Sequence, residues 1–396
     1  MVTPVAPAPR LVFAVTTDLN YDQRMQRVCG SLARAGYHVE LVGWQRAASV
    51  PLAEQPYAQH RLRGWFQRGK LFYIEYNIRL FWYLLRSRAS VWCCVDLDTA
   101  LPMWARAAIS NQLFAYDAHE LFPEVPEVVG RPRVQRMWQW VEDFIVPRAH
   151  LRYTVGPALA RLFGQRHAGL PFAVVRNVPV VGVSQVEDAR ATLGRANQAT
   201  GGQHTLADGA PILLYQGVLN VGRGLAQLLD AMPLVPARLV ICGEGDCSAD
   251  LRQRAQRLGL LATGQVEFRG YVRPSELRQL TAQSTVGIML LENTGLSYYY
   301  SLANKFFDYV QAGIPQLCID FPEYRALNTQ HEVAALVPDL APATIVAALA
   351  HLLPGGQAGA YYQHLAANCR RARTEWNWQQ EEKVLIDLYD NLLATK

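Results

Sequence analysis

Two positive side chains in the second half of the sequence stand where they can hold a phosphate. Arg223 follows Tyr215-Gln216-Gly217 in a turn between a strand-like run and a helical run, and its guanidinium can bind phosphate through two hydrogen bonds. Lys305 lies in the first turn of a predicted helix, where its charge repels the positive end of the helix dipole unless a bound anion compensates. Phosphate binding is therefore favoured. The alternatives are a plain glycine turn with a surface arginine, and a surface lysine paired with Asp308.

A histidine flanked by acids forms a second candidate site, Tyr116-Asp117-Ala118-His119-Glu120. It follows the apolar run Gln112–Tyr116, and open parallel sheets bind ligands outside the carboxyl ends of their strands. Imidazole titrates near neutral pH, so His119 and the two acids could bind hydroxyl groups or exchange protons. In the alternative interpretation, Asp117 and Glu120 only cap the next turn.

A third candidate turn reads Cys242-Gly243-Glu244-Gly245-Asp246, at the end of the strand-like run Arg238–Cys242. Ser248 replaces the third glycine of the dinucleotide-binding fingerprint, which argues against a nicotinamide cofactor. Gly243 and Gly245 could pack closely against a base or a ribose. A tight turn explains both glycines equally well.

The helix that carries Lys305 is predicted to span about Leu302–Ala312. Ser301 is its predicted N-cap, and Gly313 is its predicted stop. The preceding strand-like run ends at Leu291, so the start of the helix is expected to point at the ligand-binding edge of the sheet.

Strand-like and helical runs alternate along the chain, which predicts an α/β fold with parallel sheets and crossover helices. The polar stretch Gly194–Gly209 is a predicted exposed loop, after which the alternation restarts, so two sheets in tandem are expected. The predicted strands are Leu11–Val15, Val39–Gly43, Val91–Val95, Gln112–Tyr116, Ile212–Tyr215, Arg238–Cys242, Val266–Arg269, Val286–Leu291 and Gln316–Ile319. Further predicted helices are Asp22–Ala35, Leu225–Leu234, Leu251–Leu258 and Trp378–Leu393.

Length and composition suit an enzyme with two large domains. The 396 residues exceed one ordinary core, and 51% of them are hydrophobic. The net charge of +5 is scattered along the chain, so no nucleic-acid partner is expected. The seven cysteines lack a CxxC pair and zinc-type spacing to a histidine, so buried free thiols in a reducing compartment are expected. No signal peptide and no run of ~18 apolar residues is seen, which favours a cytoplasmic protein.

The stretch 60–88 combines basic and aromatic side chains. Two interpretations stay open: a helix that lies in a membrane interface, and a core helix with a solvated basic edge. The basic residues are Arg61, Arg63, Arg68, Lys70, Arg79, Arg86 and Arg88, and the aromatic residues are Trp65, Phe66, Phe72, Tyr73, Phe81, Trp82 and Tyr83.

These motifs, in this order, resemble the bacterial retaining glycosyltransferases of the GT-B fold (glycosyltransferase group 1, family 4-like), in the branch that builds polysaccharides and lipid-linked glycans. The similarity runs from Leu11 to about Leu393. Its most specific parts are Tyr116-Asp117-Ala118-His119-Glu120, Tyr215-Gln216-Gly217 with Arg223-Gly224, and Ser301-Leu302-Ala303-Asn304-Lys305-Phe306-Phe307-Asp308-Tyr309 with Ala312-Gly313-Ile314-Pro315.

The resemblance implies an α/β protein with two facing Rossmann-like domains, parallel sheets and a cleft between them. Residues 1–178 would form the acceptor-side domain, residues 179–376 the nucleotide-sugar-binding domain, and residues 377–396 a helix that crosses back to the first domain. A UDP- or GDP-sugar donor and a glycan or polyprenyl-linked acceptor are implied. The protein would then work in the cytoplasm, with contact to the inner face of the membrane through residues 60–88.

By the same resemblance, His119, Arg223 and Lys305 are the catalytic residues. His119 would touch the donor sugar or the acceptor, while Arg223 and Lys305 would hold the diphosphate and stabilise the charge that builds on it as the glycosidic bond breaks. Asp308 stands where the family usually has a glutamate that binds the nucleotide ribose. The other predicted substrate-binding residues are Asp18, Asn20, Arg24, Asp117, Glu120, Gly217, Gly243, Gly245, Glu292, Tyr300, Ser301, Leu302 and Asn304.

The sequence departs from the family pattern at two places. The family often carries two acidic residues eight positions apart, and here the first is Tyr300 and the second is the shorter Asp308. Glu292 replaces the first acid only if the intervening loop folds back. The first strand-helix loop, Thr16–Asp22, lacks the paired glycines that are common in relatives, and its polar residues are expected to line the acceptor side instead.

No metal ion and no cofactor are expected, because arginine, lysine and helix dipoles take the place of a divalent cation in this fold. Asp96-Leu97-Asp98 looks like a metal-binding DxD, but its partner residues are not evident. Retention by front-face attack, with the leaving phosphate as base, follows from the resemblance. Two alternatives remain: a sugar-nucleotide epimerase of the same architecture, and an inactive glycan-binding or partner-binding protein, suggested by Tyr300 and Asp308.

Overall fold

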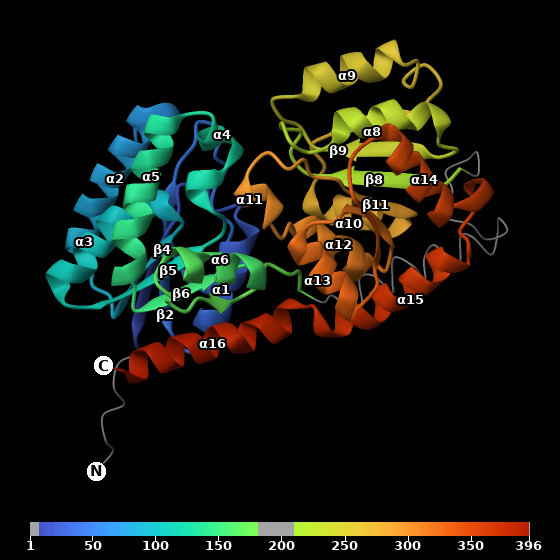
Figure 1. Ribbon diagram of the computed structural model, residues 1–396. Helices are drawn as coiled ribbons and strands as arrows, with labels where there is room; N and C mark the ends of the chain where they lie inside the picture. Colours follow the sequence, from blue (N-terminus) through green and yellow to red (C-terminus); the bar gives the residue numbers. More distant parts are fainter. Residues whose placement is uncertain (1–7, 181–209, 396) are drawn as a thin grey trace. The chain divides into compact units, whose positions relative to one another are not determined.

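The protein forms two compact α/β units, each built on a parallel sheet (Figure 1). The computed structural model describes residues 8–180 and 210–395, so the predicted loop Gly194–Gly209 lies outside the described residues. Unit 1 comprises Met1–Asn177 and Gln380–Lys396, and unit 2 comprises Val178–Gln379. The predicted α/β class with two tandem parallel sheets is confirmed.

Unit 1 holds a parallel sheet with the strand order β3-β2-β1-β4-β5-β6-β7 in its described part. The order reverses between β1 and β4, and ligands of such sheets bind at the carboxyl ends beside this reversal. The strands are β1 (Arg10–Ala14), β2 (His38–Trp44), β3 (Ala58–Leu62), β4 (Val91–Val95), β5 (Leu113–Ala118), β6 (Leu151–Thr154) and β7 (Ala173–Val174).

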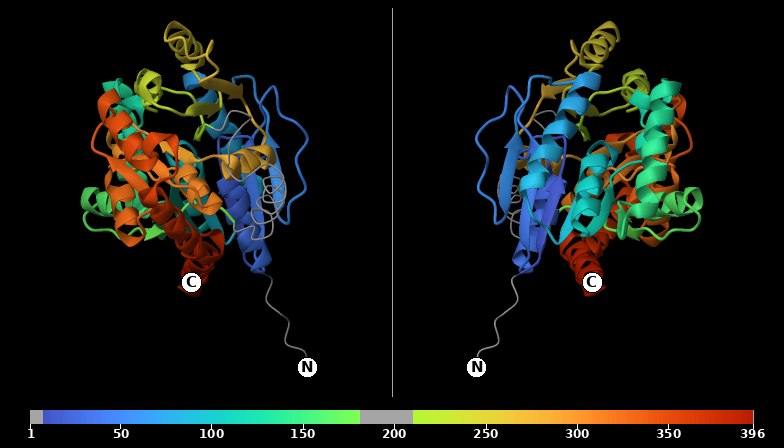
Figure 2. Two further views of the ribbon diagram at one scale, coloured as in Figure 1. Left: turned by 90° about the vertical axis from the view of Figure 1, so that its right-hand side faces the viewer. Right: turned by 90° about the vertical axis from the view of Figure 1, so that its left-hand side faces the viewer.

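The helices of unit 1 follow from local sequence signals. Asp22 caps the first helix, because its carboxylate accepts a hydrogen bond of 3.0 Å from the backbone N–H of Met25, and Gly36 follows the helix with φ of +99°. The second, third and fifth helices lie side by side over one face of the sheet (Figures 1 and 2). The helices are α1 (Gln23–Arg34), α2 (Gly69–Arg86), α3 (Ala100–Ser110), α4 (Pro126–Val129), α5 (Pro132–Ile145) and α6 (Pro157–Arg166).

The stretch 60–88 was predicted to be one helix, and this prediction is wrong. Its first residues complete the strand β3, which pairs with β2, and α2 begins only at Gly69. A single-sequence pattern could not show this edge strand, because its residues are mostly polar and half-buried without alternation, and its pairing partner is distant in the sequence.

The last helix, α16 (Trp378–Ala394), belongs to unit 1 from Gln380 onward. Its Tyr389 is fully buried, with its ring 6.0 Å from that of Phe13 and its hydroxyl 3.2 Å from the Tyr153 hydroxyl. Glu381 accepts a hydrogen bond of 2.7 Å from the side chain of Arg176. The chain end is therefore part of the unit 1 core.

Unit 2 repeats the architecture, with the strand order β10-β9-β8-β11-β12-β13 in its described part. The order reverses between β8 and β11. The strands are β8 (Ile212–Gln216), β9 (Arg238–Cys242), β10 (Val266–Gly270), β11 (Val286–Met289), β12 (Gln316–Ile319) and β13 (Ala334–Val337). The helices are α8 (Leu225–Ala231), α9 (Ser248–Arg257), α10 (Pro274–Gln283), α11 (Leu296–Tyr299), α12 (Asn304–Ala312), α13 (Pro322–Gln330), α14 (Pro342–Leu352) and α15 (Ala360–Glu375).

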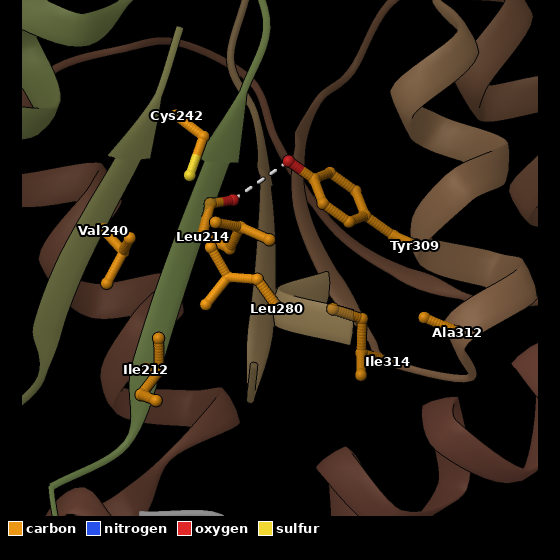
Figure 3. Close-up of a cluster of buried hydrophobic side chains, with 8 residues drawn as sticks. All are labelled: Ile212, Leu214, Val240, Cys242, Leu280, Tyr309, Ala312 and Ile314. Carbon is orange, nitrogen blue, oxygen red and sulfur yellow. Dashed lines mark hydrogen bonds between the residues drawn. The ribbon is translucent and has the colours of Figure 1, made fainter. Parts of the chain in front are cut away.

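The core under α12 fixes the position of this helix on the sheet. Figure 3 shows Tyr309 reaching from α12 to β8, where its hydroxyl donates a hydrogen bond of 2.9 Å to the carbonyl of Leu214. The ring also lies where a side chain on Gly287 of β11 would collide with it. Since Tyr309 is one helical turn after Lys305, these contacts also set the place of the lysine.

The predicted N-cap of α12 is wrong. The helix begins at Asn304, after Ala303, and Ser301 instead donates its hydroxyl hydrogen to the Tyr298 carbonyl at 2.8 Å. The first turn of α12 therefore has no side-chain cap. No helix in the described residues is long and apolar enough to span a membrane.

Candidate functional site

Lys305 carries its ammonium group in a buried position. Its side chain comes from the first turn of α12, only 8% of the residue is exposed, and its Nζ lies 3.8 Å from the centre of the Tyr215 ring. Among the described residues no acceptor hydrogen-bonds this ammonium and no carboxylate lies within 4.0 Å of it. The alternative of a surface lysine paired with Asp308 is therefore wrong.

Arg223 adds a second positive charge to the same place. Its guanidinium lies 4.9 Å from the centre of the Tyr298 ring, and its buried Nε has no hydrogen-bond partner in the described part of the chain. Burial, and then the charge of Arg223, lower the pKa of Lys305 well below its ordinary value. Two cations held together, with no ion pair to an acid among the described residues, indicate a site for an anion.

Gly217 lies against Lys305, directly after the end of β8. The Nζ of Lys305 is 3.6 Å from the position that a Cβ on Gly217 would take, and Gly217 has φ of +133°. The Tyr215 hydroxyl donates a hydrogen bond of 2.8 Å to the carbonyl of Val218, which holds the turn. The predicted phosphate turn and the predicted phosphate lysine thus meet in unit 2.

Gly243 and Gly245 pack against the same turn. A Cβ on Gly243 would lie 1.8 Å from the carbonyl oxygen of Gly217, and a Cβ on Gly245 would lie 2.5 Å from Oδ1 of Asn220. Gly243 also has φ of +141°, which side chains rarely allow. Both glycines are therefore required by close packing within a tight turn, which is one of the two interpretations that the sequence left open.

Replacing Gly243 by alanine is expected to destabilise the protein by about 3 kcal/mol, because the methyl group must displace backbone and the conformation is strained. Gly259→Ala is the matched control. Gly259 also has a positive φ, of +74°, but no atom lies within 4 Å of its Cβ position, so a loss of only about 1 kcal/mol is expected. Urea unfolding measures both variants, and equal losses would contradict the role of the Gly217 contact.

Asp308 lies one turn after Lys305 and takes part in a polar chain. The Gln216 amide donates a hydrogen bond of 2.9 Å to the Asp308 carboxylate, and its oxygen accepts one of 2.8 Å from the Thr281 hydroxyl. Gln216 links the end of β8 to α12 in this way. The chain orients Asp308, the residue predicted to bind a ribose.

The remaining predicted residues of unit 2 lie in the segment from the end of β11 to the first residue of α12. The backbone N–H of Glu292 donates a hydrogen bond of 2.9 Å to the Gly222 carbonyl, next to Arg223. Tyr300 follows α11, with its ring 5.1 Å from that of Tyr299. Leu302 is buried and Asn304 is exposed. Glu292 is thus beside the Arg223 turn.

In unit 1, Arg24, Asp117 and His119 form one hydrogen-bonded network. Arg24 contacts the Asp117 carboxylate at 3.0 Å, and Nε2 of His119 lies 3.0 Å from the other Asp117 oxygen. The side chain of Asp117 is fully buried within β5, so it is not a residue after the strand as predicted. Burial opposes charge on both groups, but the Arg24 and His119 charges lower the pKa of Asp117, and the two carboxylates Asp117 and Asp96 raise the pKa of His119.

The Asp96-Leu97-Asp98 segment is part of this network. Asp96 accepts a hydrogen bond of 2.8 Å from the backbone N–H of His119, and Asp98 accepts one of 2.6 Å from the Thr16 hydroxyl. Burial, and then repulsion from Asp96, raise the pKa of Asp98 to about 7. Among the described residues, the one group with metal-binding spacing is Glu142, Asp143 and His167, which lies apart from this segment in the sequence.

The other predicted residues of unit 1 either form contacts within the loop between β1 and α1 and its neighbours, or are exposed to solvent. Asp18 forms an ion pair of 2.6 Å with Arg61, and the Asn20 amide donates a hydrogen bond of 2.8 Å to the Pro51 carbonyl. Glu120 is exposed. The structure thus brings Arg24, Asp117 and His119 together, and it engages Asp18 and Asn20 in a separate loop.

Sequence reasoning missed the two rings that support the cations. Tyr215 was visible only as an aromatic residue at the end of a strand-like run. Tyr298 gave no signal, because its contact with Arg223 depends on α11, a single helical turn that no periodicity predicts.

Comparison with protein families gives a match for most of the described part of unit 2. Residues 210–354 match the family model described as Glycosyl transferases group 1. This segment contains Gly217, Arg223, Lys305 and Asp308. A comparison with curated proteins gives no match to the sequence.

Solved structures match the fold over nearly the whole chain. Sucrose-phosphate synthase from Thermosynechococcus elongatus has a TM-score of 0.76 at 18% identity, covering 98% of this chain and 100% of that one. Anabaena HepE in complex with UDP and glucose has a TM-score of 0.72 at 13% identity, covering 97% and 100%. WaaG, a glycosyltransferase involved in lipopolysaccharide biosynthesis, has a TM-score of 0.65 at 13% identity, covering 96% and 99%. At these identities the likeness shows the fold, which is GT-B.

Proposed function

We propose that this glycosyltransferase, whose group 1 domain spans residues 210–354, transfers a sugar from a nucleotide-diphosphate donor to a glycan or lipid-linked acceptor. The observation that carries the proposal is the pair Arg223 and Lys305, two cations beside the Gly217 turn that form no ion pair with an acid of the described residues. A diphosphate supplies the negative charge that this place lacks.

The donor is bound by unit 2 in this proposal. Arg223 and Lys305 contact the diphosphate, and Asp308, oriented by Gln216, accepts hydrogen bonds from the ribose hydroxyls. A UDP- or GDP-sugar is our expectation for the donor. The match to HepE, which was solved with UDP and glucose, supports UDP as the first nucleotide to test.

The two cations also act on the reaction. Negative charge grows on the leaving diphosphate as its bond to the sugar breaks, and Arg223 and Lys305 already stand in place to stabilise it. The low exposure of Lys305 strengthens this effect, because little water screens its charge. We propose that transfer proceeds without a metal ion or another cofactor and with retention of configuration, so chelation should leave the rate unchanged.

Acceptor binding is assigned to unit 1. His119 is held by Asp117 and Asp96 with about a quarter of its side chain exposed, so its imidazole can contact a sugar hydroxyl. Burial opposes charge on this imidazole, but the carboxylates of Asp117 and Asp96 raise its pKa. We propose that His119 orients the acceptor or the donor sugar.

The test is a thermal-shift screen against UDP-, GDP-, ADP- and dTDP-sugars. We expect one donor to raise the Tm of the wild type, and Arg223→Ala to lose that rise. Arg278, an exposed arginine on α10, gives the matched control Arg278→Ala, which should behave as the wild type.

The screen also separates the alternatives. Binding of no nucleotide sugar would favour an inactive glycan-binding or partner-binding protein. Binding with conversion of the donor to a second nucleotide sugar, without an acceptor, would favour the epimerase. Release of free nucleotide diphosphate that depends on an added acceptor supports the transferase.

A further inference from the structure

A buried histidine and two carboxylates meet at the ends of two helices of unit 1. Glu142 and Asp143 lie in the last turn of α5, and His167 is the C-cap of α6. Nε2 of His167 lies 3.1 Å from Oε1 of Glu142, and Nδ1 lies 3.9 Å from Oδ1 of Asp143. Glu142 and His167 are buried, whereas the Asp143 side chain is 58% exposed. The cluster places one nitrogen and two carboxylate oxygens within 4.8 Å of one another.

Two buried polar atoms at this cluster have no hydrogen-bond partner in the described part of the chain. One is Oε2 of Glu142, the carboxylate oxygen that His167 does not contact, and the other is the hydroxyl of Tyr116 on β5. Burial, and then the charge of Glu142, raise the pKa of the Tyr116 hydroxyl, which lies within the field of this carboxylate. A buried polar atom without a partner costs free energy unless a water or an ion contacts it. The contact between Glu142 and His167 therefore leaves the cluster incomplete.

Negative charge is in excess at the cluster. Among the described residues, Arg166 is the one arginine or lysine within 4.0 Å of either carboxylate, with Nη1 4.0 Å from Oε1 of Glu142. Arg166 is already paired with Glu124 at 3.0 Å. With a neutral imidazole, Glu142 and Asp143 leave two negative charges, which one divalent cation balances. The C-terminal end of α6, where His167 lies, adds the negative end of a helix dipole.

The ligand atoms fit a transition-metal ion better than magnesium or calcium. Imidazole nitrogen with carboxylate oxygen is a ligand set of zinc, and two such ligands of a tetrahedral zinc lie about 3.4 Å apart. The 3.1 Å between His167 and Glu142 is close to this distance. Asp143 is farther away, but its exposed side chain is able to move inward. The Gln139 amide, which donates hydrogen bonds of 3.4 and 3.1 Å to Glu142 and Asp143, already holds both carboxylates on one side of α5.

We propose that Glu142, Asp143 and His167 bind one divalent transition-metal ion, for which Zn²⁺ is the probe. The metal gives the unpartnered oxygen of Glu142 a ligand, and it ties the end of α5 to the end of α6, which stabilises unit 1. None of the three ligands is assigned to sugar transfer, so the proposal does not depend on the proposed function. Chelation should lower the Tm and leave the rate of transfer unchanged.

Isothermal titration calorimetry of the full-length protein, freed of metal with EDTA, tests the proposal with Zn²⁺. We expect one strong site per chain with a Kd below about 10 μM. Zn²⁺ at about a hundredfold excess over its Kd should raise the Tm by about 5 °C. Asp143→Asn should weaken Zn²⁺ binding by at least about tenfold, and it keeps the fold because Asp143 is exposed. His364→Gln is the matched control, since His364 contacts Glu332 at 3.1 Å in unit 2, and it should bind as the wild type.

Two further measurements separate this site from other zinc ligands. With Co²⁺ in place of Zn²⁺, nitrogen and oxygen ligands give d–d absorption without the thiolate charge-transfer band that Cys247, the one cysteine that is only partly buried, would give. His167→Gln should also lose the strong site, with circular dichroism as the check of its fold, and Asp143→Asn alone decides if it does not fold. Equal Zn²⁺ binding by the wild type and the folded variants would overturn the proposal, and so would a thiolate band or a wild-type Kd in the millimolar range.

Discussion

Lys305→Met is expected to raise the stability of the protein and to abolish donor binding. In the free protein, Lys305 places an ammonium group in a buried position, where it forms no ion pair with an acid of the described residues. An apolar side chain of similar length removes the cost of that burial. A gain of about 1–3 kcal/mol in the free energy of unfolding is expected. In the same variant kcat/KM for sugar transfer should fall by about a hundredfold or more, since one of the two cations at the leaving group is lost.

The gain in stability should depend on pH in one direction. Lys305 has a lowered pKa in the folded protein, so the unfolded chain binds more protons up to the ordinary lysine pKa of about 10.4. The wild type therefore becomes more stable relative to Lys305→Met as the pH rises toward that value. The difference between the two proteins should be largest at neutral pH and should shrink toward pH 10.

Urea unfolding at several pH values measures this difference, and thermal shift with the donor measures binding. Lys383→Met is the matched control, because Lys383 lies exposed on α16 and its replacement should change neither quantity. A Lys305→Met protein that is less stable than the wild type at neutral pH would show that an anion or a water network already satisfies the lysine. Retained donor binding would remove Lys305 from the proposed site.

The sequence predicted the strands that lead to the site better than the contacts within it. The strands β4, β9 and β12 have the predicted bounds, because continuous apolar runs mark strands that are buried on both faces. The edge strand β3 was missed, since it is only partly buried and polar. A run of apolar residues in the local sequence predicts a fully buried strand, whereas the pairing of an edge strand depends on a neighbouring strand that is distant in the sequence.

The phosphate site was predictable in residue type but not in its surroundings. A glycine and an arginine after a strand and a lysine in the first turn of a helix predicted an anion site, and the structure brings Gly217 and Lys305 together. The burial of Lys305 could not be predicted, because it depends on the Tyr215 ring and on the position of α12 on the sheet. Tyr309 fixes that position through its hydrogen bond to β8. In unit 1 the acid Asp18 looked free to bind a ligand, but its partner Arg61 lies on the missed strand β3.

Removing the carboxylate of Asp117 should destabilise the protein more than any surface change. Asp117 and Arg24 are both buried, with side-chain exposures of 0% and 3%. In Asp117→Ala, the Arg24 guanidinium loses its carboxylate partner and keeps only its hydrogen bonds to the Val175 carbonyl and to His119. Breaking a buried pair on one side costs about 3–5 kcal/mol, because the remaining charge stays uncompensated. Asp320→Ala is the matched control, since its partner Arg325 is 65% exposed and a loss of at most about 1 kcal/mol is expected.

The origin of the loss can be tested by removing both charges and by changing the pH. The double variant Arg24→Met/Asp117→Val should recover much of the stability, because no buried charge is left. The pKa of Asp117 is lowered in the folded protein, so its contribution is present above the ordinary aspartate pKa of about 3.9 and is lost as the pH falls through the folded pKa. The loss in Asp117→Ala should therefore be full at pH 7 and should diminish only in strong acid. A double variant as unstable as Asp117→Ala would mean that the carboxylate stabilises unit 1 through His119 rather than through Arg24, and His119→Ala would then reproduce the loss.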